Sequence, residues 1–307
     1  MVIGIDNGNA NTKTVHTTFT SGITKHDLKP PMADEVIKFD NKFYTLSSKR
    51  NTYTRDKTNN ENCFILTLFA IAKEVLEDGK FEPEMDIDLA VGLPPEHYSL
   101  LKDKFGNYFK SFGRHIEYEY NERYFSININ SVMVFPQAFS AVVSKPSNLK
   151  NYSRTYIVDI GGYTTDVLLL ANGKPDLSYC RSLELGIITM NNAIKGRVST
   201  AYDIQIEEEH IYDVLTDRQT ILSPEIQNFI KENASKHAEN ILDNLREQGI
   251  DLKASPAIFA GGGALLLRPY LESSKKTQLI EFLPDISANA VGYTILANGM
   301  LRKKNNI

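Results

Sequence analysis

The chain has 307 residues, of which 42% are apolar and 23% are charged, and its formal net charge is −4. This length is enough for two domains of ordinary size with a sizeable core. The charge gives no basic excess for direct nucleic-acid binding or for binding an anionic membrane surface. The two cysteines, Cys63 and Cys180, lie outside any Cys-x-x-Cys pair, which argues against a disulfide framework or a thiolate metal site.

The sequence shows no pattern typical of a membrane span or a signal peptide. No apolar run approaches the roughly 18 residues of a membrane span. An acid, Asp6, follows the first few residues, which leaves no apolar region of the signal-peptide kind. The sequence therefore predicts a soluble, cytoplasmic protein.

The first half of the chain alternates predicted strands and helices. Strands are expected at 1–6, 12–19, 86–92, 114–130 and 131–136, with a hairpin at 35–46 around Asn41, and helices at 62–80, 99–112 and 137–144. Gly79 is a natural stop for the first of these helices.

A segment rich in Pro, Ser and Asn, Ser144 to Arg154, is expected to be a linker. After it, strands are expected at 156–160, 164–170, 175–184 and 256–260, and helices within 187–250, after a glycine turn up to residue 272, and at 287–301. The longest helix has Ser223 as a predicted N-cap, Pro224 at its first position and Gly249 at its end.

This pattern predicts two domains, 1–150 and 151–307. A small subdomain is expected at about 20–80 in the first domain, and a helical one at about 187–253 in the second. The final helix, about 287–302, is expected to pack back towards the first domain.

A repeated motif connects the two halves. "VIGIDNGNANTK" begins at Val2 and "YIVDIGGYTTDVLLL" at Tyr156, and each is an apolar strand, an Asp, a glycine turn and a Thr-containing strand. Thr12 and Thr165 each follow the Asp by the same interval. A single Asp-x-Gly turn is most simply a hairpin turn, but two copies in matched context indicate two related domains that offer one turn each to a shared cleft.

The residue types of these turns favour phosphate chemistry. A glycine turn lets successive backbone N–H groups approach phosphate oxygens. The carboxylates of Asp6 and Asp159 would repel a phosphate, so a cation is expected between them. Mg²⁺ fits best because it keeps most of its water and needs few carboxylates. Asp6 and Asp159 are therefore expected to hold it through water, and Lys13 to contact the phosphates.

A third glycine turn, "AGGGA" at Ala260 to Ala264, lies between a predicted strand and a helix. Such a turn can be a tight packing turn. It can also allow close approach of a flat ligand, with the helix N-terminus facing an anion.

These motifs, in this order and over nearly the whole chain, resemble the actin–Hsp70–sugar kinase superfamily. "VGLPPEHY" from Val91 and "VFPQAFSAV" from Val134 are similar to segments of the ParM-like bacterial actins, which are plasmid-segregation ATPases. The resemblance implies an α/β fold with two ribonuclease-H-like domains around a nucleotide cleft, each with a small inserted subdomain. It also implies ATP or ADP with Mg²⁺, filaments of the chain itself, and a DNA-binding adaptor protein at a plasmid centromere.

The resemblance also assigns site residues. It implies nucleotide contacts from Asp6, Gly8, Asn9, Ala10, Asn11, Thr12 and Lys13, from Gly161, Gly162, Tyr163 and Thr164, and from the adenosine loop Gly261, Gly262 and Gly263. Asp159 and Gln137 are the expected catalytic residues, and Gln137 would orient the attacking water. ParM has an acid at that position and actin a glutamine, so the rate of hydrolysis is left open. Gln137 can also be a plain helix N-terminal residue.

The adenine contacts are expected between Gly186 and Glu209 but are not assigned to residues, and the choice between ATP and GTP stays open. The alternative function is a small-molecule, sugar-type kinase on the same fold. Such a kinase needs a carboxylate base for its acceptor, and Gln137 is not an acid. An Hsp70-type chaperone would carry a long substrate-binding region, and a membrane-tethered actin would need an amphipathic anchor, for which "LANGMLRKKNNI" is a weak candidate.

Overall fold

The computed structural model describes residues 1–54, 56–145 and 147–305. Contacts between Cα atoms divide the chain into two compact units: unit 1 is Met1–Pro146 with Ser287–Ile307, and unit 2 is Ser147–Ile286. The expected boundary at residue 150 lies just beyond that division. The expected linker contains a short 3₁₀ helix, Asn148–Asn151.

Unit 1 combines a mixed sheet with four helices in the part that the structure describes. Its strands are β1 (Val2–Asn7), β2 (Asn11–Lys13), β3 (Thr18–Thr20), β4 (Ile23–His26), β5 (Val36–Phe39), β6 (Lys42–Leu46), β7 (Glu84–Leu93), β8 (His115–Tyr120) and β9 (Arg123–Pro136). Its helices are α1 (Asn62–Glu77), α2 (Pro95–Lys110), α3 (Phe139–Val143) and α8 (Ala288–Asn305).

The sheet of unit 1 has the strand order β3-β2-β1-β7-β9-β8-β5-β6-β4. β1 and β2 are antiparallel, as are β2 and β3, whereas β1, β7 and β9 run parallel. The hairpin expected at 35–46 is present as β5 and β6, with Asp40 and Asn41 at φ values of 48° and 56°. It extends the main sheet through β8.

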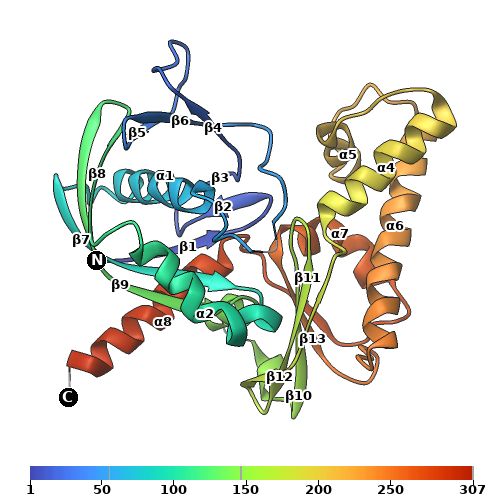
Figure 1. Cartoon of the computed structure of the whole chain (residues 1–307). Helices are drawn as coiled ribbons and strands as arrows, with labels where there is room; N and C mark the ends of the chain where they lie inside the picture. Colours follow the sequence, from blue (N-terminus) through green and yellow to red (C-terminus); the bar gives the residue numbers. More distant parts are fainter. Residues whose placement is uncertain (55, 146, 306–307) are drawn as a thin grey trace. The chain divides into compact units, whose positions relative to one another are not determined.

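Helices cover both faces of β1. Ile3 and Ile5 pack in the core with the side chains of α1, and the alternate positions, Val2 and Gly4, lie on the side of α8. Figure 1 shows α1 and α8 on opposite sides of β1. α1 is apolar nearly all round because it is buried nearly all round. On the other face, Tyr293 of α8 is fully buried and stacks on Phe135 at 6.2 Å between ring centroids.

Unit 2 repeats the same core with fewer strands. Its strands are β10 (Arg154–Ile160), β11 (Thr165–Ala171), β12 (Lys174–Leu183), β13 (Ala257–Ala260) and β14 (Ile280–Phe282). Its helices are α4 (Ile187–Tyr202), α5 (Glu208–Leu215), α6 (Pro224–Glu247) and α7 (Gly261–Ser273). The sheet order is β12-β11-β10-β13-β14, with the first three strands antiparallel and the last three parallel.

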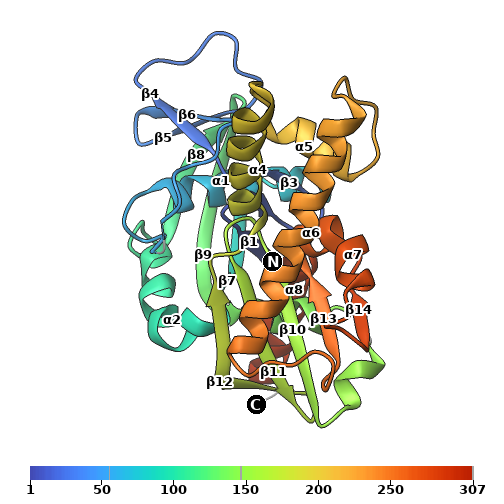
Figure 2. The same cartoon turned by 90° about the vertical axis from the view of Figure 1, so that its right-hand side faces the viewer.

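That order matches β3-β2-β1-β7-β9 of unit 1, strand for strand and direction for direction. The α/β fold with two related cores, expected from the repeated motif, is therefore confirmed. Figure 2 shows α6 running beside α4, with α5 near one end of α6. The predicted caps of α6 are also present, because Ser223 accepts a hydrogen bond from the amide of Ile226 and Gly249 has a φ of 81°.

Several local predictions were wrong. The strand expected at 12–19 is two short strands, because the Thr14 amide donates to the Thr17 carbonyl and closes a turn between them. The two strands expected at 114–136 are divided by a hairpin at Asn121 and Glu122, and everything after it is one strand, β9. The glycines at 261–263 form the first turn of α7 and are not a separate loop. No helix in the described parts of the chain is both long and apolar enough to cross a membrane.

His237 should make unit 2 sensitive to acid. It lies on α6, and burial lowers its pKa below 6.5, against the opposing effect of its hydrogen bond to the Leu185 carbonyl. The unfolded state therefore binds more protons than the folded state as the pH falls below about 6.5, and stability is lost. We expect the melting temperature to fall between pH 7 and pH 5, and to fall less in His237→Gln.

Thermal unfolding at both pH values checks this expectation. His115→Gln is the control, because the pKa of His115 is shifted in the opposite direction. Hydrogen bonds to Asn128 and Glu117 raise the pKa of that exposed histidine. Its removal should not reduce the loss of stability in acid. Identical acid sensitivity in the wild type and in His237→Gln would contradict the assignment.

Candidate functional site

The first glycine turn joins β1 to β2 in unit 1. In the antiparallel register Asp6 lies opposite Lys13 and Asn7 opposite Thr12, so Gly8 to Asn11 form the turn. Asp6 is 5% exposed and Thr12 is fully buried. A Cβ on Gly8 would lie 2.5 Å from the Asn11 carbonyl oxygen, so the turn is too tight for any other residue there.

Gln137 lies beside this turn although it is far away in sequence. Its Nε2 donates to Oδ1 of Asp6 at 2.9 Å, and its backbone amide donates to the Leu93 carbonyl at 2.8 Å. The structure therefore brings together two of the residues expected in the site. The contact arises because β7 and β9 run parallel to β1, so that the carboxyl ends of all three strands meet at one edge.

The backbone after Gln137 is strained. Ala138 has φ 63° and ψ −59°, and the Phe139 amide donates to the Gln137 carbonyl at 2.7 Å, which is a γ-turn. The Ala138 amide donates to Oδ1 of Asn289 on α8, which holds this conformation. A backbone conformation of this kind is unfavourable and persists only where surrounding contacts enforce it. Such residues are common at functional sites. Here the conformation fixes the direction in which Gln137 leaves its strand.

The second glycine turn has the same construction in unit 2. Ile160 of β10 pairs with Thr165 of β11, which leaves Gly161 to Thr164 as the turn. The Gly161 amide donates to the Thr164 carbonyl at 2.8 Å. Asp159 is 7% exposed and Thr165 is fully buried. The two motifs that match in sequence are thus also matched in register and turn length.

The residue opposite the aspartate differs between the two hairpins. Lys13 faces Asp6, whereas Asp166 faces Asp159. Asp166 is 5% exposed and accepts a hydrogen bond from Oγ1 of Thr164 at 2.9 Å. Like charges directly opposite each other repel, so a pair of acids at this place favours a bound cation. Asp166 was not among the site residues expected from the sequence, although its position relative to Asp159 equals that of Lys13 relative to Asp6.

The three glycines 261–263 begin α7 directly beside Asp159. Gly261 has a φ of 87°, and a Cβ there would lie 2.4 Å from Oδ1 of Asp159. Gly263 is buried against Ile160 and Ile187, and Gly262 is exposed. The N-cap residue of α7, Ala260, has no side-chain cap, and the positive end of the helix dipole lies at these glycines.

The segment expected to contact adenine is tied to the second turn. The amides of Ile187 and Ile188, at the start of α4, donate to the carbonyls of Gly161 and Gly162. Farther along, Nδ2 of Asn191 donates to Glu208 at 3.3 Å, and Lys195 lies 3.8 Å from Glu207. Glu207 and Glu208 therefore bind side chains of α4. These contacts do not identify any one residue as the adenine contact.

The carboxylates fit a hydrated Mg²⁺ better than a fully protein-ligated metal. Among residues 1–54, 56–145 and 147–305 there is no group of three His, Cys, Asp or Glu side chains that could hold a metal ion. Magnesium is commonly held by one or two carboxylates with water and phosphate completing its shell. Asp6 and Asp159, each beside a glycine turn, fit that mode of binding.

The family models that match the chain come from the actin-like proteins. Residues 4–139 match the model described as "Actin like proteins N terminal domain", and residues 157–273 match "Archaeal actin homologue MreB-like, C-terminal". A search of curated proteins gave no match.

Solved structures share the fold over almost the whole chain. The archaeal actin homologue Ta0583 in complex with ADP is 18% identical with a TM-score of 0.74, and the match covers 97% of this chain and 99% of that one. A ParM from a 15-stranded filament of Clostridium botulinum is 18% identical with a TM-score of 0.75 and the same coverage. The apo ParM protein of pSK41 is 17% identical with a TM-score of 0.71, covering 98% of each chain.

At these sequence identities, the solved structures establish the fold alone. The family models provide the evidence from sequence for the family. The two models together span most of the chain, one in each half. With the duplicated sheet and the paired Asp–glycine hairpins, they show that this chain belongs to the actin-like proteins.

Proposed function

We propose that the chain is an actin-like ATPase that binds ATP with Mg²⁺, assembles into filaments, and disassembles after hydrolysis. The observation that carries this proposal is the duplicated hairpin. Each unit presents one Asp, one glycine turn and one buried Thr at the equivalent strand end. Two such turns supply backbone amides for phosphate groups and one carboxylate each for a hydrated cation.

Each unit has its own proposed contacts to the nucleotide. Gly8 to Lys13 would bind phosphate in unit 1, and Gly161 to Thr164 in unit 2. The start of α7, at Gly261 to Gly263, would bind the adenosine part. Mg²⁺ would be held through water by Asp6 and Asp159, and it would supply charge neutralisation at the phosphates.

Gln137 is the proposed water-orienting residue. A neutral amide can donate to and accept from a water molecule, but it cannot take its proton at neutral pH. Its hydrogen bond to Asp6 fixes one end of the amide and leaves the amide oxygen for a further partner. This supports an ATPase that positions water over a kinase that needs an acid at this place.

The biological role that we propose is plasmid segregation in the cytoplasm. Filaments that move DNA need a link to it, and a chain with a net charge of −4 and no basic excess is poorly suited to bind DNA directly. We therefore infer a DNA-binding adaptor protein at a plasmid centromere. Relatives support the assembly part, since AlfA and Alp12 also have solved filament structures.

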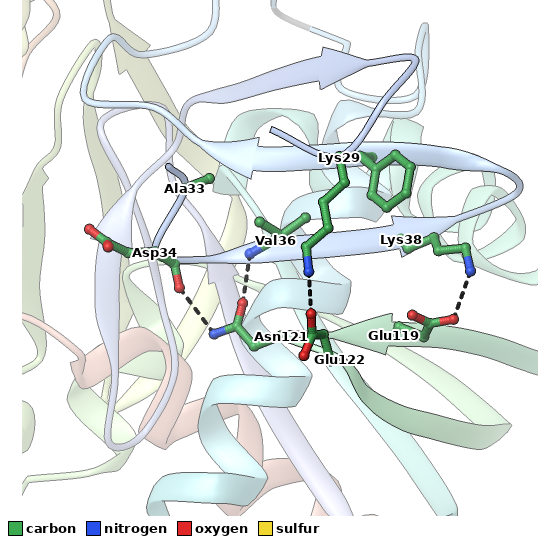
Figure 3. A pocket seen from close by; sticks show the side chains of 9 residues that line it. Lys29, Ala33, Asp34, Val36, Lys38, Glu119, Asn121 and Glu122 are labelled. Atoms are coloured by element: carbon green, nitrogen blue, oxygen red, sulfur yellow. Dashed lines mark hydrogen bonds and ion pairs between the residues drawn. The ribbon is translucent and has the colours of Figure 1, made fainter. Parts of the chain in front are cut away.

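A filament contact is proposed at the tip of unit 1. The loop between β4 and β5 carries Leu28 and Met32, which are 82% and 96% exposed. Beside it lies a surface hollow of about 310 Å³, where Lys29 pairs with Glu122 and Lys38 with Glu119 (Figure 3). Two exposed apolar side chains on a loop next to these ion pairs suit a contact with a second copy of this chain.

Assembly driven by ATP is the test of this function. Light scattering of the wild type is expected to rise on addition of ATP and Mg²⁺, to fall as ADP accumulates, and to stay high with a non-hydrolysed analogue, because the terminal phosphate favours one conformation and its loss removes that preference. The double variant Leu28→Lys, Met32→Lys is the matched control, which should bind and hydrolyse ATP without scattering. Flat scattering and sedimentation of the wild type with every nucleotide would refute the filament proposal.

A further inference from the structure

Backbone carbonyls at the first glycine turn accept hydrogen bonds from two residues later in unit 1, Ser21 and Lys57. Oγ of Ser21 donates to the Gly8 carbonyl at 2.7 Å, and the Ser21 amide donates to the Ala10 carbonyl at 2.9 Å. Nζ of Lys57 donates to the Asn7 carbonyl. The carbonyl oxygens of Gly8 and Ala10 in the turn, and that of Asn7 just before it, therefore already have donors from outside the turn.

The direction of these carbonyls decides what the turn can bind. In a trans peptide the C=O and the following N–H point in opposite directions. A carbonyl held by Ser21 or Lys57 therefore turns the next amide away from that donor. The Gly8 amide, which follows the Asn7 carbonyl, donates to the Asp6 carbonyl at 2.9 Å. The Asn7–Gly8 peptide is thus fixed at both ends, directly beside the Asp6 carboxylate.

Glycine makes this fixation necessary. The peptide before Gly8 can rotate more freely than one between two residues with side chains. Rotation would turn the Asn7 carbonyl towards the side where an anion binds, and a carbonyl oxygen repels phosphate. The Lys57 ammonium opposes that rotation because it stabilises the carbonyl in its present direction by a charge-assisted hydrogen bond.

Among the described residues, no ion pair of Lys57 accounts for the position of its ammonium group. It is half-buried and lines a hollow of about 50 Å³ together with Asn7 and Cys63. Burial raises the pKa of the Cys63 thiol to about 12, and the Lys57 charge opposes that shift. The thiol therefore stays neutral, and the Asn7 carbonyl is the one hydrogen-bond acceptor recorded for the ammonium in the parts of the chain that the structure describes.

We propose that Lys57 is a positioning residue for the first phosphate loop. It selects the peptide orientation at Asn7–Gly8 that leaves the anion side free of carbonyl oxygen. Through it, the segment 56–62 sets the nucleotide affinity of the loop. The inference rests on the proposed nucleotide-binding function of that loop.

The experiment compares Lys57→Met, Lys57→Arg and the control Lys49→Met. Lys49 is an exposed lysine that precedes this segment and is not placed in the site. Two quantities are measured: the affinity for Mg²⁺-ADP, which avoids assembly driven by ATP, and amide hydrogen exchange of residues 8–11 without nucleotide. If Lys57→Met does not fold, Lys57→Gln replaces it.

Lys57→Met is expected to weaken ADP binding about tenfold or more, the scale of one hydrogen bond to a charged group. It should also speed exchange in the loop. Lys57→Arg should restore both quantities, and Lys49→Met should change neither. Unchanged ADP affinity in Lys57→Met overturns the proposal. So does weakened affinity with wild-type exchange in the loop, because charge alone would then be responsible.

Failure of the proposed function gives a different result. A wild type that binds neither ADP nor ATP refutes nucleotide binding. The exchange comparison in the nucleotide-free protein then still decides whether Lys57 fixes the turn.

Discussion

Asp159→Asn is expected to fold like the wild type and to hydrolyse ATP about 10²-fold more slowly or worse, the scale of loss when a group that stabilises developing charge is removed. The substitution keeps the shape of the side chain and removes its charge. Asp159 lies at the end of β10 with Oδ1 against the backbone of Gly261, so a larger or differently shaped residue would disturb α7. The isosteric amide avoids that disturbance.

The expected loss of turnover in Asp159→Asn follows from the role proposed for Asp159 in holding a cation. Asp159 faces Asp166 across the hairpin, and both are nearly buried. A hydrated Mg²⁺ beside this pair would offset their repulsion and join the protein to the phosphates. With asparagine at position 159, that attraction is weakened where the terminal phosphate is proposed to bind.

Steady-state phosphate release and thermal melting are the measurements. The matched control is Asp176→Asn, which removes a partly exposed carboxylate from β12 of the same unit and should leave turnover unchanged. Wild-type turnover in a well-folded Asp159→Asn protein would contradict the assignment. A large loss of melting temperature would instead indicate a structural role.

Gln137→Ala should retain nucleotide binding while turnover falls by roughly 10²-fold, the usual scale for groups that position water or transfer protons. The side chain donates to Asp6 in the structure, so its removal frees one carboxylate oxygen without adding bulk. Because that oxygen gains access to water or Mg²⁺, the affinity for Mg²⁺-ADP should change far less than turnover.

A split between affinity and turnover is therefore the diagnostic result for Gln137. Titration with Mg²⁺-ADP gives the first quantity and single-turnover hydrolysis the second. Gln219→Ala, which changes an exposed loop glutamine in unit 2, is the control. Equal losses in affinity and turnover would show that Gln137 acts on the structure of the turn and not on water.

Gln137→Glu adds a sharper comparison. It replaces a donor to Asp6 with a second carboxylate at about 2.9 Å, where two negative charges repel strongly. If Gln137 acts through Asp6 as well as through water, this variant should weaken Mg²⁺-ADP binding more than Gln137→Ala does.

Local sequence was enough to predict the two hairpins. Each strand, turn and return strand is contiguous, and its register follows from the turn length and from alternate burial. Asp6 with Thr12, and Asp159 with Thr165, therefore stand out as a repeat in the linear sequence. The start of α6 at Ser223 and its end at Gly249 were predictable for the same reason, since caps depend on neighbours within a few residues.

Local sequence led to wrong predictions where the same residue pattern is compatible with two different structures. Residues 12–19 are rich in β-branched side chains, which predicts one strand, but a tight turn at Thr14 to Thr17 divides them. The glycines at 261–263 indicate a flexible turn, but they form the first turn of α7, where Gly263 packs closely against Ile160 and Ile187.

The sequence by itself determined the fold class, the duplication and the two Asp–glycine turns, because these depend on contiguous residues and on a periodicity that each half repeats. Only the tertiary structure decided that Gln137 touches Asp6 and that Lys57 donates a hydrogen bond to the first turn. These contacts join residues that are 131 and 50 positions apart in the sequence. Their geometry comes from parallel strand order and core packing, which bring distant side chains to one sheet edge and which no local pattern encodes.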